Sequence, residues 1–199
     1  NYHVVGDGVV ISVMLSDGRI FTAKRLGIDR QGDIALIKIT GREPFPCAGF
    51  GDSDALRRGQ WAAAAGNPWM TALADGRPSL TLGVISGLHR YEGEGFVYGD
   101  AIQIDTPINP GSSGGPLFDL EGRLIGINGK IHTRRGRRNS GIGYAVTIRQ
   151  IGYFLDDLKA GREVFHGMAG LRLEDEPSIS MSMSMGGARI VEVSSGSPA

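Results

Sequence analysis

The sequence of 199 residues is poor in cysteine and has no excess charge of either sign, and each shortage excludes a class of protein. The single cysteine, Cys47, excludes an internal disulfide and a cysteine-pair metal site, so we expect it to be a small buried side chain. Basic and acidic residues number 21 each, which gives no overall attraction to nucleic acid or to anionic membranes. Apolar residues are plentiful but form no long run, which favours a soluble globular protein.

Glycine, by contrast, is abundant, and its placement predicts an all-β fold. The 32 glycines follow no collagen-like period and separate short apolar runs, a pattern typical of many short strands in barrels or a sandwich. Asp17 and Gly18 predict the turn of a hairpin. The expected strands are residues 9–15, 20–24, 34–39, 60–66, 79–88, 101–106, 123–129 and 141–146.

One segment, residues 147–161, has helical rather than strand periodicity. Thr147 and Gln150 have the spacing of a capping box, and Gly161 is placed to end the helix. The apolar residues that would form its buried face are Ile148, Ile151, Phe154, Leu155 and Leu158. Beyond it, the alternating Ser and Met of residues 179–185 predict a flexible loop or an edge strand rather than a metal site.

The glycine-rich stretch at residues 111–115, Gly-Ser-Ser-Gly-Gly, fits two kinds of hydrolase. It fits the nucleophile elbow of α/β-hydrolases, but that motif needs a helix directly after the serine, and Pro116 leads into another strand. It also fits the serine loop of trypsin-like proteases, in which the triad follows the order His, Asp, Ser. His3, Asp33 and Ser113 occur in that order.

Trypsin-like chemistry also explains the glycines around Ser113. The backbone N–H groups of Gly111 and Ser113 would form an oxyanion hole, because the attacked carbonyl oxygen becomes negative. Gly114 and Gly115 would remove side chains that crowd the substrate.

Several segments together resemble the HtrA (DegP-like) family of trypsin-fold serine proteases. They are "NYHVV", "DIALIKI", "FGDSDALRRGQWAAAAGNP", "AIQIDTPINPGSSGGPLFDLEGRLIGIN" and "GIGYAV", and the resemblance covers residues 1–160. It implies a protease domain over residues 1–162, built from two antiparallel Greek-key β-barrels and closed by a short helix. Because the chain starts two residues before His3, we expect it to be truncated, with the first strands of the first barrel missing.

The resemblance also implies the catalytic roles. Ser113 would be the nucleophile, His3 the general base and Asp33 the residue that orients the imidazole, with no cofactor. Asp29 is the chief rival of Asp33, but the family motif aligns on "DIALIKI". Ser112 stands where many relatives carry asparagine, and we assign the nucleophile to Ser113 because it directly precedes the Gly-Gly pair.

Substrate preference follows from the residues that the resemblance places beside the serine loop. They are small or apolar, so we expect a small aliphatic side chain before the scissile bond. These specificity-pocket candidates are Ile127, Asn128, Gly141, Ile142 and Gly143.

Beyond the helix, "FHGMAGLRLEDE" resembles the start of a PDZ domain, which implies a partial PDZ domain over residues 163–199. Such a domain would bind peptide C-termini by adding the peptide as a strand. The carboxylate-binding loop would consist of Met168, Ala169, Gly170 and Leu171.

The resemblance as a whole predicts a serine endopeptidase that degrades misfolded or unfolded proteins outside the cytoplasm, in a bacterial periplasm or cell envelope, as a homotrimer or larger oligomer. The alternative is an inactive peptide-binding or chaperone-like protein that keeps the protease fold. The arginine-rich stretch at residues 130–138 is typical of a solvated hairpin tip rather than a nucleic-acid site. A sharper hypothesis pairs Arg134, Arg135, Arg137 and Arg138 with an acidic partner.

Overall fold

The computed structural model describes residues 1–7, 10–41, 44–73, 76–93, 95–131, 140–167, 169–176, 187–196 and 198. The chain forms two compact units, Asn1–Val164 and Phe165–Ala199. Residues 132–138 of the arginine-rich stretch, the Ser/Met stretch at 179–185 and Met168 lie outside the described residues. The assignment of residues 1–162 to a protease domain and 163–199 to a PDZ domain stays a prediction.

The first unit begins with a three-stranded antiparallel sheet. Its strands are β1 (Ile11–Met14), β2 (Ile20–Asp29) and β3 (Ile34–Ile39), in the order β1-β2-β3. The hairpin predicted between β1 and β2 is confirmed: Gly18 has a φ of 84° and its N–H donates to the Leu15 carbonyl. A left-handed φ of this kind favours glycine, which explains why the turn falls there.

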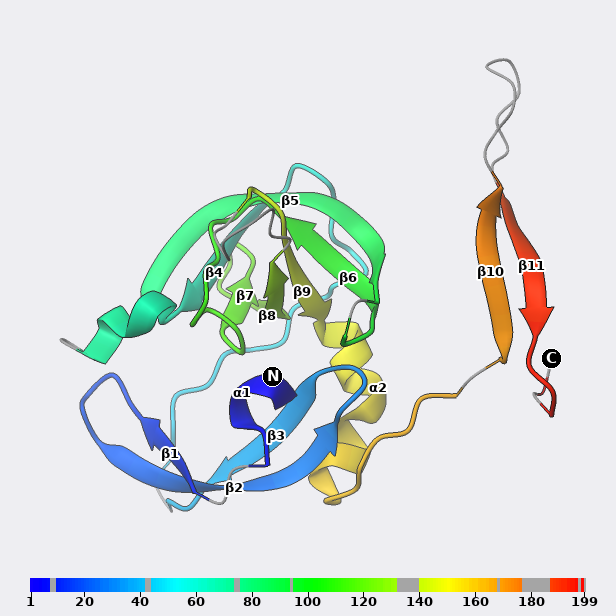
Figure 1. The fold of residues 1–199 in the computed structure, drawn as a ribbon. Coiled ribbons are helices and arrows are strands. Elements are labelled where there is room, and N and C mark those ends of the chain that lie inside the picture. Colours follow the sequence, from blue (N-terminus) through cyan, green and yellow to red (C-terminus); the bar gives the residue numbers. More distant parts are fainter. Residues whose placement is uncertain are drawn as a thin grey trace. The chain divides into compact units, whose positions relative to one another are not determined.

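Six further strands close into a barrel in the order β4-β5-β6-β9-β8-β7, drawn in the upper part of Figure 1. They are β4 (Trp61–Gly66), β5 (Ser79–Glu92), β6 (Tyr98–Ile104), β7 (Pro116–Phe118), β8 (Leu124–Ile131) and β9 (Gly143–Thr147). Small and branched apolar side chains fill its interior. Those with no exposed surface include Ala62, Ile85, Ile102, Ile104, Leu117, Ile125 and Ala145. Where two barrels were expected, the described residues form one closed barrel and one open sheet.

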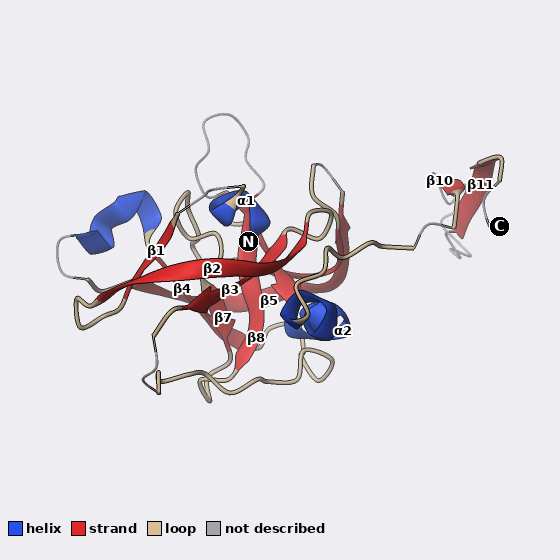
Figure 2. Cartoon of the chain, turned by 90° about the horizontal axis from the view of Figure 1, so that it is seen from below, coloured by secondary structure: helices blue, strands red, loops and turns tan. Residues whose placement is uncertain are grey.

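The predicted helix is confirmed as α2 (Ile148–Lys159). The Thr147 side chain accepts a hydrogen bond from the Gln150 N–H at 3.2 Å, and Gly161 follows the helix with a φ of 77°. The helix lies against β2 and β3 at the side of the sheet (Figure 2). A side chain at Gly27 of β2 would lie 2.4 Å from the Leu158 carbonyl oxygen, so glycine permits this close approach.

Two short helices were not predicted. The first, α1 (Tyr2–Val5), carries His3, and the second, the 3₁₀ helix η1 (Pro68–Leu73), lies between β4 and β5. Four to six residues show too few periodic positions to be recognised as helical from sequence.

The expected burial of Cys47 is wrong, because its side chain is exposed. Cys47 lies in the irregular connection between β3 and β4, where its neighbours Pro46 and Ala48 are exposed as well. Because this connection runs over the surface, Cys47 is exposed despite the usual preference of cysteine for burial.

The second unit contains a two-stranded antiparallel sheet, β10 (Leu171–Glu176) and β11 (Gly187–Val193). Leu171 pairs with Val193, and a register shift occurs between Arg172 and Leu173. None of the helices in the described parts of either unit is long and apolar enough to span a membrane.

Candidate active site

His3, near the start of the chain, is in direct contact with Asp33, in the turn before β3. The His3 Nδ1 atom lies 2.7 Å from Asp33 Oδ2, and the His3 backbone N–H donates to Asp33 Oδ1 at 2.9 Å. The Tyr2 N–H donates to the Asp33 carbonyl at 3.0 Å, so α1 is tied to the turn before β3. These bonds fix both the position and the ring orientation of His3.

Asp33 is completely buried, whereas the His3 side chain is one-third exposed. Asp33 also has a φ of 60°, in the left-handed region that few residues other than glycine adopt. Such backbone strain is concentrated at functional sites. A carboxylate oxygen accepts hydrogen bonds, so this contact favours the tautomer in which Nδ1 of His3 is the donor and Nε2 is left for another partner. The sequence-predicted base and its orienting acid are therefore brought together.

The rival aspartate has a different environment. Asp29 is also buried, but its Oδ1 accepts a hydrogen bond from the Gly32 N–H at 2.7 Å. A side chain at Gly32 would lie 2.3 Å from Asp29 Oδ2, so this residue packs tightly inside the turn that follows β2. The two hydrogen bonds described for His3 join it to Asp33 and not to Asp29.

The backbone conformation and close packing of the serine loop require glycine at several positions. Gly111 and Gly114 have φ values of 101° and 81°. A side chain at Gly111 would lie 2.3 Å from the Asn67 carbonyl oxygen, and one at Gly115 would lie 2.1 Å from the Ala65 carbonyl oxygen. The loop therefore packs directly on the end of β4, with no room for side chains at these positions.

This backbone leaves two N–H groups available. Within the described ranges, the N–H groups of Gly111 and Ser113 donate to no protein acceptor, whereas those of Ser112, Gly114 and Gly115 all do. The two free donors are the ones that the sequence predicts for the oxyanion hole. Their availability is what such a hole requires, because the donors must be directed at a substrate oxygen.

The two serines of the loop differ in their contacts. Ser112 is buried, and its Oγ accepts a hydrogen bond from the Asn109 N–H at 3.3 Å. Ser113 is half-buried, and its hydroxyl donates to the Gly129 carbonyl at 3.1 Å. Among the described contacts, no hydrogen bond joins Ser113 to His3. The predicted nucleophile and the predicted base are therefore each bonded to another residue in this structure.

Direct packing brings α1 to the serine loop. A side chain built at Gly114 would lie 3.2 Å from the backbone nitrogen of Asn1, two residues before His3. Figure 1 shows α1 between the β1–β3 sheet and the barrel. The site therefore lies where the two halves of the first unit meet.

Two aromatic residues at this site were not predicted. The Phe96 ring stacks on His3 with centroids 5.6 Å apart, and the Tyr98 hydroxyl donates to Asp33 Oδ2 at 2.8 Å. Tyr98 and Asp33 are 65 residues apart in sequence, and no short motif links them. The sequence therefore contained no local signal for either contact.

The predicted specificity residues have different surroundings. Ile127 lines a mainly apolar cavity of about 210 Å³ that extends to Gly114 and α2. Asn128 is fully buried, and its side-chain amide donates to the carbonyls of Ala65 and Pro116. Ile142 is half-buried and Gly141 is exposed, with a φ of 82°.

Gly143 packs closely on Ile108, whose Cδ1 would lie 2.7 Å from a side chain built there. The grouping of Ile127, Asn128, Gly141, Ile142 and Gly143 into one pocket stays a prediction.

The predicted peptide-binding loop falls only partly within the described residues. Ala169 is exposed, and Gly170 has a φ of 69°. The Gly170 carbonyl accepts a hydrogen bond from the Ser194 N–H at 2.7 Å, which closes the end of the β10–β11 pair next to Leu171. Its role in binding peptide C-termini stays a prediction.

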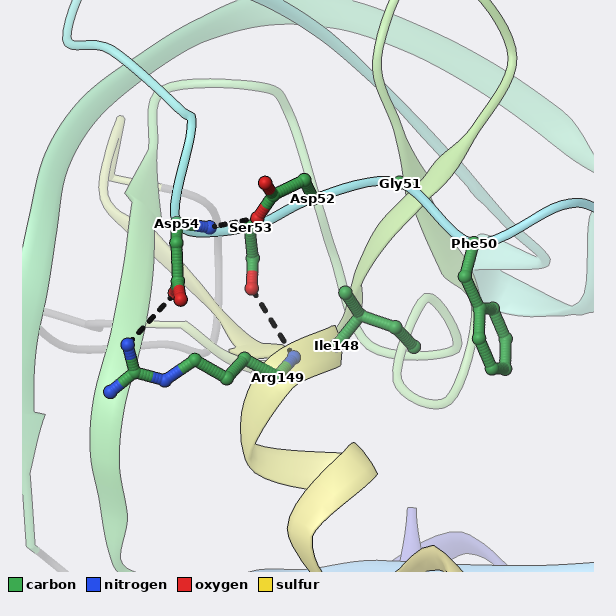
Figure 3. A pocket seen from close by; sticks show the side chains of 7 residues that line it. All are labelled: Phe50, Gly51, Asp52, Ser53, Asp54, Ile148 and Arg149. Atoms are coloured by element: carbon green, nitrogen blue, oxygen red, sulfur yellow. Dashed lines mark hydrogen bonds and ion pairs between the residues drawn. The ribbon is translucent and has the colours of Figure 1, made fainter.

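A separate depression of about 260 Å³ lies at the N-terminal end of α2 and is lined by Phe50, residues 51–54, Ile148 and Arg149 (Figure 3). The Arg149 N–H donates to Ser53 Oγ at 3.2 Å, and the Arg149 guanidinium pairs with Asp54 at 3.0 Å. These contacts hold the loop against the helix, so we interpret the depression as a result of their packing and not as a binding site. In the described ranges, no three His, Cys, Asp or Glu side chains form a group that could hold a metal ion.

The family of trypsin-like peptidase domains matches residues 1–127. A probable periplasmic DegP-like serine endoprotease of Chlamydia trachomatis is 38% identical over 203 aligned residues, which cover 100% of this chain and 39% of that protein. The corresponding protein of Pseudomonas fluorescens is 38% identical, over 88% of this chain and 35% of that protein. The chain thus spans under half the length of these relatives.

Solved structures agree with the sequence comparisons. The HtrA-type protease AlgW with a decapeptide matches with a TM-score of 0.80 and 32% identity, over 100% of this chain and 60% of that one. AlgW with a tripeptide matches with a TM-score of 0.79 and 34% identity, over 87% of this chain and 56% of that one. The chain therefore belongs to the HtrA/DegP-like family of trypsin-fold serine proteases.

Proposed function

We propose that this chain carries the catalytic unit of a serine endopeptidase that degrades unfolded or misfolded proteins. The observation that carries the proposal is the buried Asp33 carboxylate bonded to both the ring and the backbone of His3, next to a loop with two free N–H donors. A carboxylate that holds a histidine in one tautomer is what general-base catalysis on a serine hydroxyl requires.

In the first half of the reaction, Ser113 Oγ attacks the carbonyl carbon of the scissile bond, and His3 Nε2 takes the hydroxyl proton. Before the attack, the hydroxyl rotates from the Gly129 carbonyl towards His3. The negative oxygen that forms is stabilised by the N–H groups of Gly111 and Ser113. The C–N bond then breaks, and His3 gives its proton to the leaving amine, which leaves an acyl ester on Ser113.

In the second half, a water molecule attacks the ester carbonyl and His3 accepts one of the water protons. The same two N–H groups stabilise the second tetrahedral oxygen. The C–O bond to Ser113 breaks, and His3 returns the proton to the Ser113 oxygen. The carboxylic acid product leaves, and the enzyme is regenerated without a cofactor.

The test compares wild type, Ser113→Ala and Ser112→Ala on unfolded casein, with the protein in its gene-encoded length. We expect Ser113→Ala to reduce cleavage at least about 1,000-fold, because the nucleophile is lost. Ser112→Ala is the matched control, since it removes a neighbouring hydroxyl from the same loop. Equal cleavage by wild type and Ser113→Ala would reject Ser113 as the nucleophile.

The second candidate function is peptide binding without turnover, and one observation favours it: the Ser113 hydroxyl donates to Gly129 rather than to His3. A fluorophosphonate probe separates the two, because it reacts only with a serine that a base activates. Covalent labelling of the peptide that contains Ser113 supports the protease. Binding of unfolded protein with no labelling supports the alternative.

Partners and location follow from the relatives by analogy. The curated relatives are named periplasmic endoproteases, and the solved relative AlgW is described with a decapeptide and with a tripeptide. The names support action outside the cytoplasm. The family resemblance implies a homotrimer or larger oligomer and binding of peptide C-termini through residues 168–171. The small or apolar pocket candidates imply a small aliphatic residue before the scissile bond. Fractionation, sedimentation analysis and cleavage-site sequencing test these points separately.

A further inference from the structure

Tyr98 reaches from the barrel to the acid of the proposed triad. It is the first residue of β6, is almost fully buried, and donates its hydroxyl to Asp33 Oδ2 at 2.8 Å. The same oxygen accepts the His3 Nδ1–H at 2.7 Å, while Asp33 Oδ1 accepts the His3 backbone N–H. The carboxylate is therefore held by three donors, and one of them comes from the opposite half of the unit.

The surroundings of the hydroxyl make this bond strong. A buried hydroxyl without a partner is unfavourable, and one that donates to a charged acceptor is favourable, so the pair stabilises one geometry. Burial and the adjacent Asp33 charge raise the pKa of Tyr98 far above its usual value. The hydroxyl consequently stays a donor throughout the pH range in which a histidine base operates.

Gly129 of β8 provides the space for Tyr98. A side chain at Gly129 would lie 2.2 Å from the Tyr98 hydroxyl oxygen, closer than any real contact. The carbonyl of the same residue accepts the Ser113 hydroxyl. One glycine therefore contacts both the proposed nucleophile and the tyrosine that holds the proposed acid.

The residues before Tyr98 contact the same groups. Phe96 stacks on the His3 ring, and the Val97 N–H donates to the Gln31 carbonyl at 2.8 Å, two residues before Asp33. Residues 96–98 thus hold the His3–Asp33 pair by a ring contact, a backbone bond and a side-chain bond.

We propose that Tyr98 is a positioning residue for catalysis: its hydroxyl fixes Asp33 Oδ2 so that His3 Nδ1–H stays bonded and Nε2 faces the substrate. The proposal rests on the proposed protease function. Tyr98 touches no reacting atom, so it would act on the reaction only through Asp33 and His3.

The test is Tyr98→Phe in the protein of gene-encoded length. Loss of one hydrogen bond to a charged group predicts a decrease in kcat of about 10- to 100-fold. KM should stay within about twofold, because the substrate does not contact this hydroxyl. The matched control is Tyr91→Phe, which removes an exposed hydroxyl from β5 and should leave both constants unchanged. Unchanged kcat in a folded Tyr98→Phe protein would overturn the proposal.

A second measurement does not depend on cleavage. In a Ser113→Ala background, the low-field proton NMR signal of His3 Nδ1–H reports on its bond to Asp33. We expect this signal to broaden and shift in Tyr98→Phe, because Asp33 Oδ2 is no longer held in one position. Replacing Tyr98 by 3-fluorotyrosine keeps the shape but strengthens the donor, so the signal should move upfield.

These readouts separate the two proposals. If Ser113→Ala cleaves like wild type, the protease assignment fails while the NMR signal still tests the Tyr98–Asp33 bond. If the signal is the same in wild type, Tyr98→Phe and the fluorinated protein, the positioning role is wrong even when the protease assignment holds.

Discussion

Ser112 and Ser113 are neighbours in the glycine-rich loop, yet their side chains have different surroundings. Ser112 is buried against the Asn109 backbone, whereas the Ser113 hydroxyl is half-buried beside two unused N–H donors. The sequence favoured Ser113 from its position before the Gly-Gly pair, and its surroundings support that choice. Tyr98 could not be predicted, because its contact with Asp33 depends on the packing of strands from two different sheets.

The first prediction concerns Ser112. Ser112→Ala should keep casein cleavage within about threefold of wild type, while the lost hydrogen bond lowers the free energy of unfolding by about 1 kcal/mol. Cleavage assays and urea unfolding measure the two effects. A loss of activity as large as that of Ser113→Ala would contradict the assignment.

The second prediction separates the two aspartates. Asp33→Asn should lower kcat by about 10⁴-fold, since the amide no longer holds His3 in the required tautomer. Asp29→Asn should mainly destabilise the turn after β2, where Asp29 accepts the Gly32 N–H, and reduce kcat only a few-fold. Parallel kinetics and thermal unfolding of both variants decide between them. Equal kcat values would mean that Asp29 shares the role.

At the scale of helices and strands, a strong local pattern was sufficient to predict the element from the sequence. Residues 34–39 form a strand as predicted, and α2 has its predicted cap and stop. The three-residue strand β7 was missed because it has too few positions to show alternation. β5 extends to Glu92, beyond the predicted end at residue 88, because pairing with β6 maintains an irregular, polar stretch in extended form.

The third prediction concerns the cap of α2. Thr147→Ala should lower the free energy of unfolding by about 1 kcal/mol, because the Gln150 N–H loses its acceptor. Thr147→Ser keeps the hydroxyl and should retain most of the stability. Urea unfolding in the Ser113→Ala background, which prevents self-cleavage, provides the measurement. Equal loss in both variants would assign the effect to the lost methyl group instead.

At the scale of the whole molecule, burial of Tyr98 makes the stability of the first unit pH-dependent. The groups that face its hydroxyl are Asp33, which accepts its hydrogen bond, and Glu92 of β5, which pairs with Lys130 of β8. Burial is the main reason that the folded pKa of Tyr98 is raised, with Asp33 next. The unfolded chain ionises its tyrosines near pH 10, so the folded state loses relative stability as the pH rises above that value.

The fourth prediction follows from that sign. Above about pH 10, Tyr98 should contribute a loss of up to about 1.4 kcal/mol per pH unit to the free energy of unfolding, the slope for one proton. Tyr98→Phe should show a shallower decline between about pH 9 and pH 11, whereas below pH 9 its curve should run parallel to that of wild type. Urea unfolding across this range, in the Ser113→Ala background, tests it. Identical slopes would show that Tyr98 ionises as freely in the fold as in the unfolded chain.

The position of α1 between the sheet and the barrel has a consequence for control of the reaction. His3 and Asp33 belong to the sheet side, while Ser113 and its two N–H donors belong to the barrel. In the proposed mechanism, neither half holds all of the reacting groups, so neither half could cleave a peptide by itself. If the proposed mechanism holds, activity depends on the contact between the sheet and the barrel, and a small separation of the two would abolish cleavage while every strand remained folded.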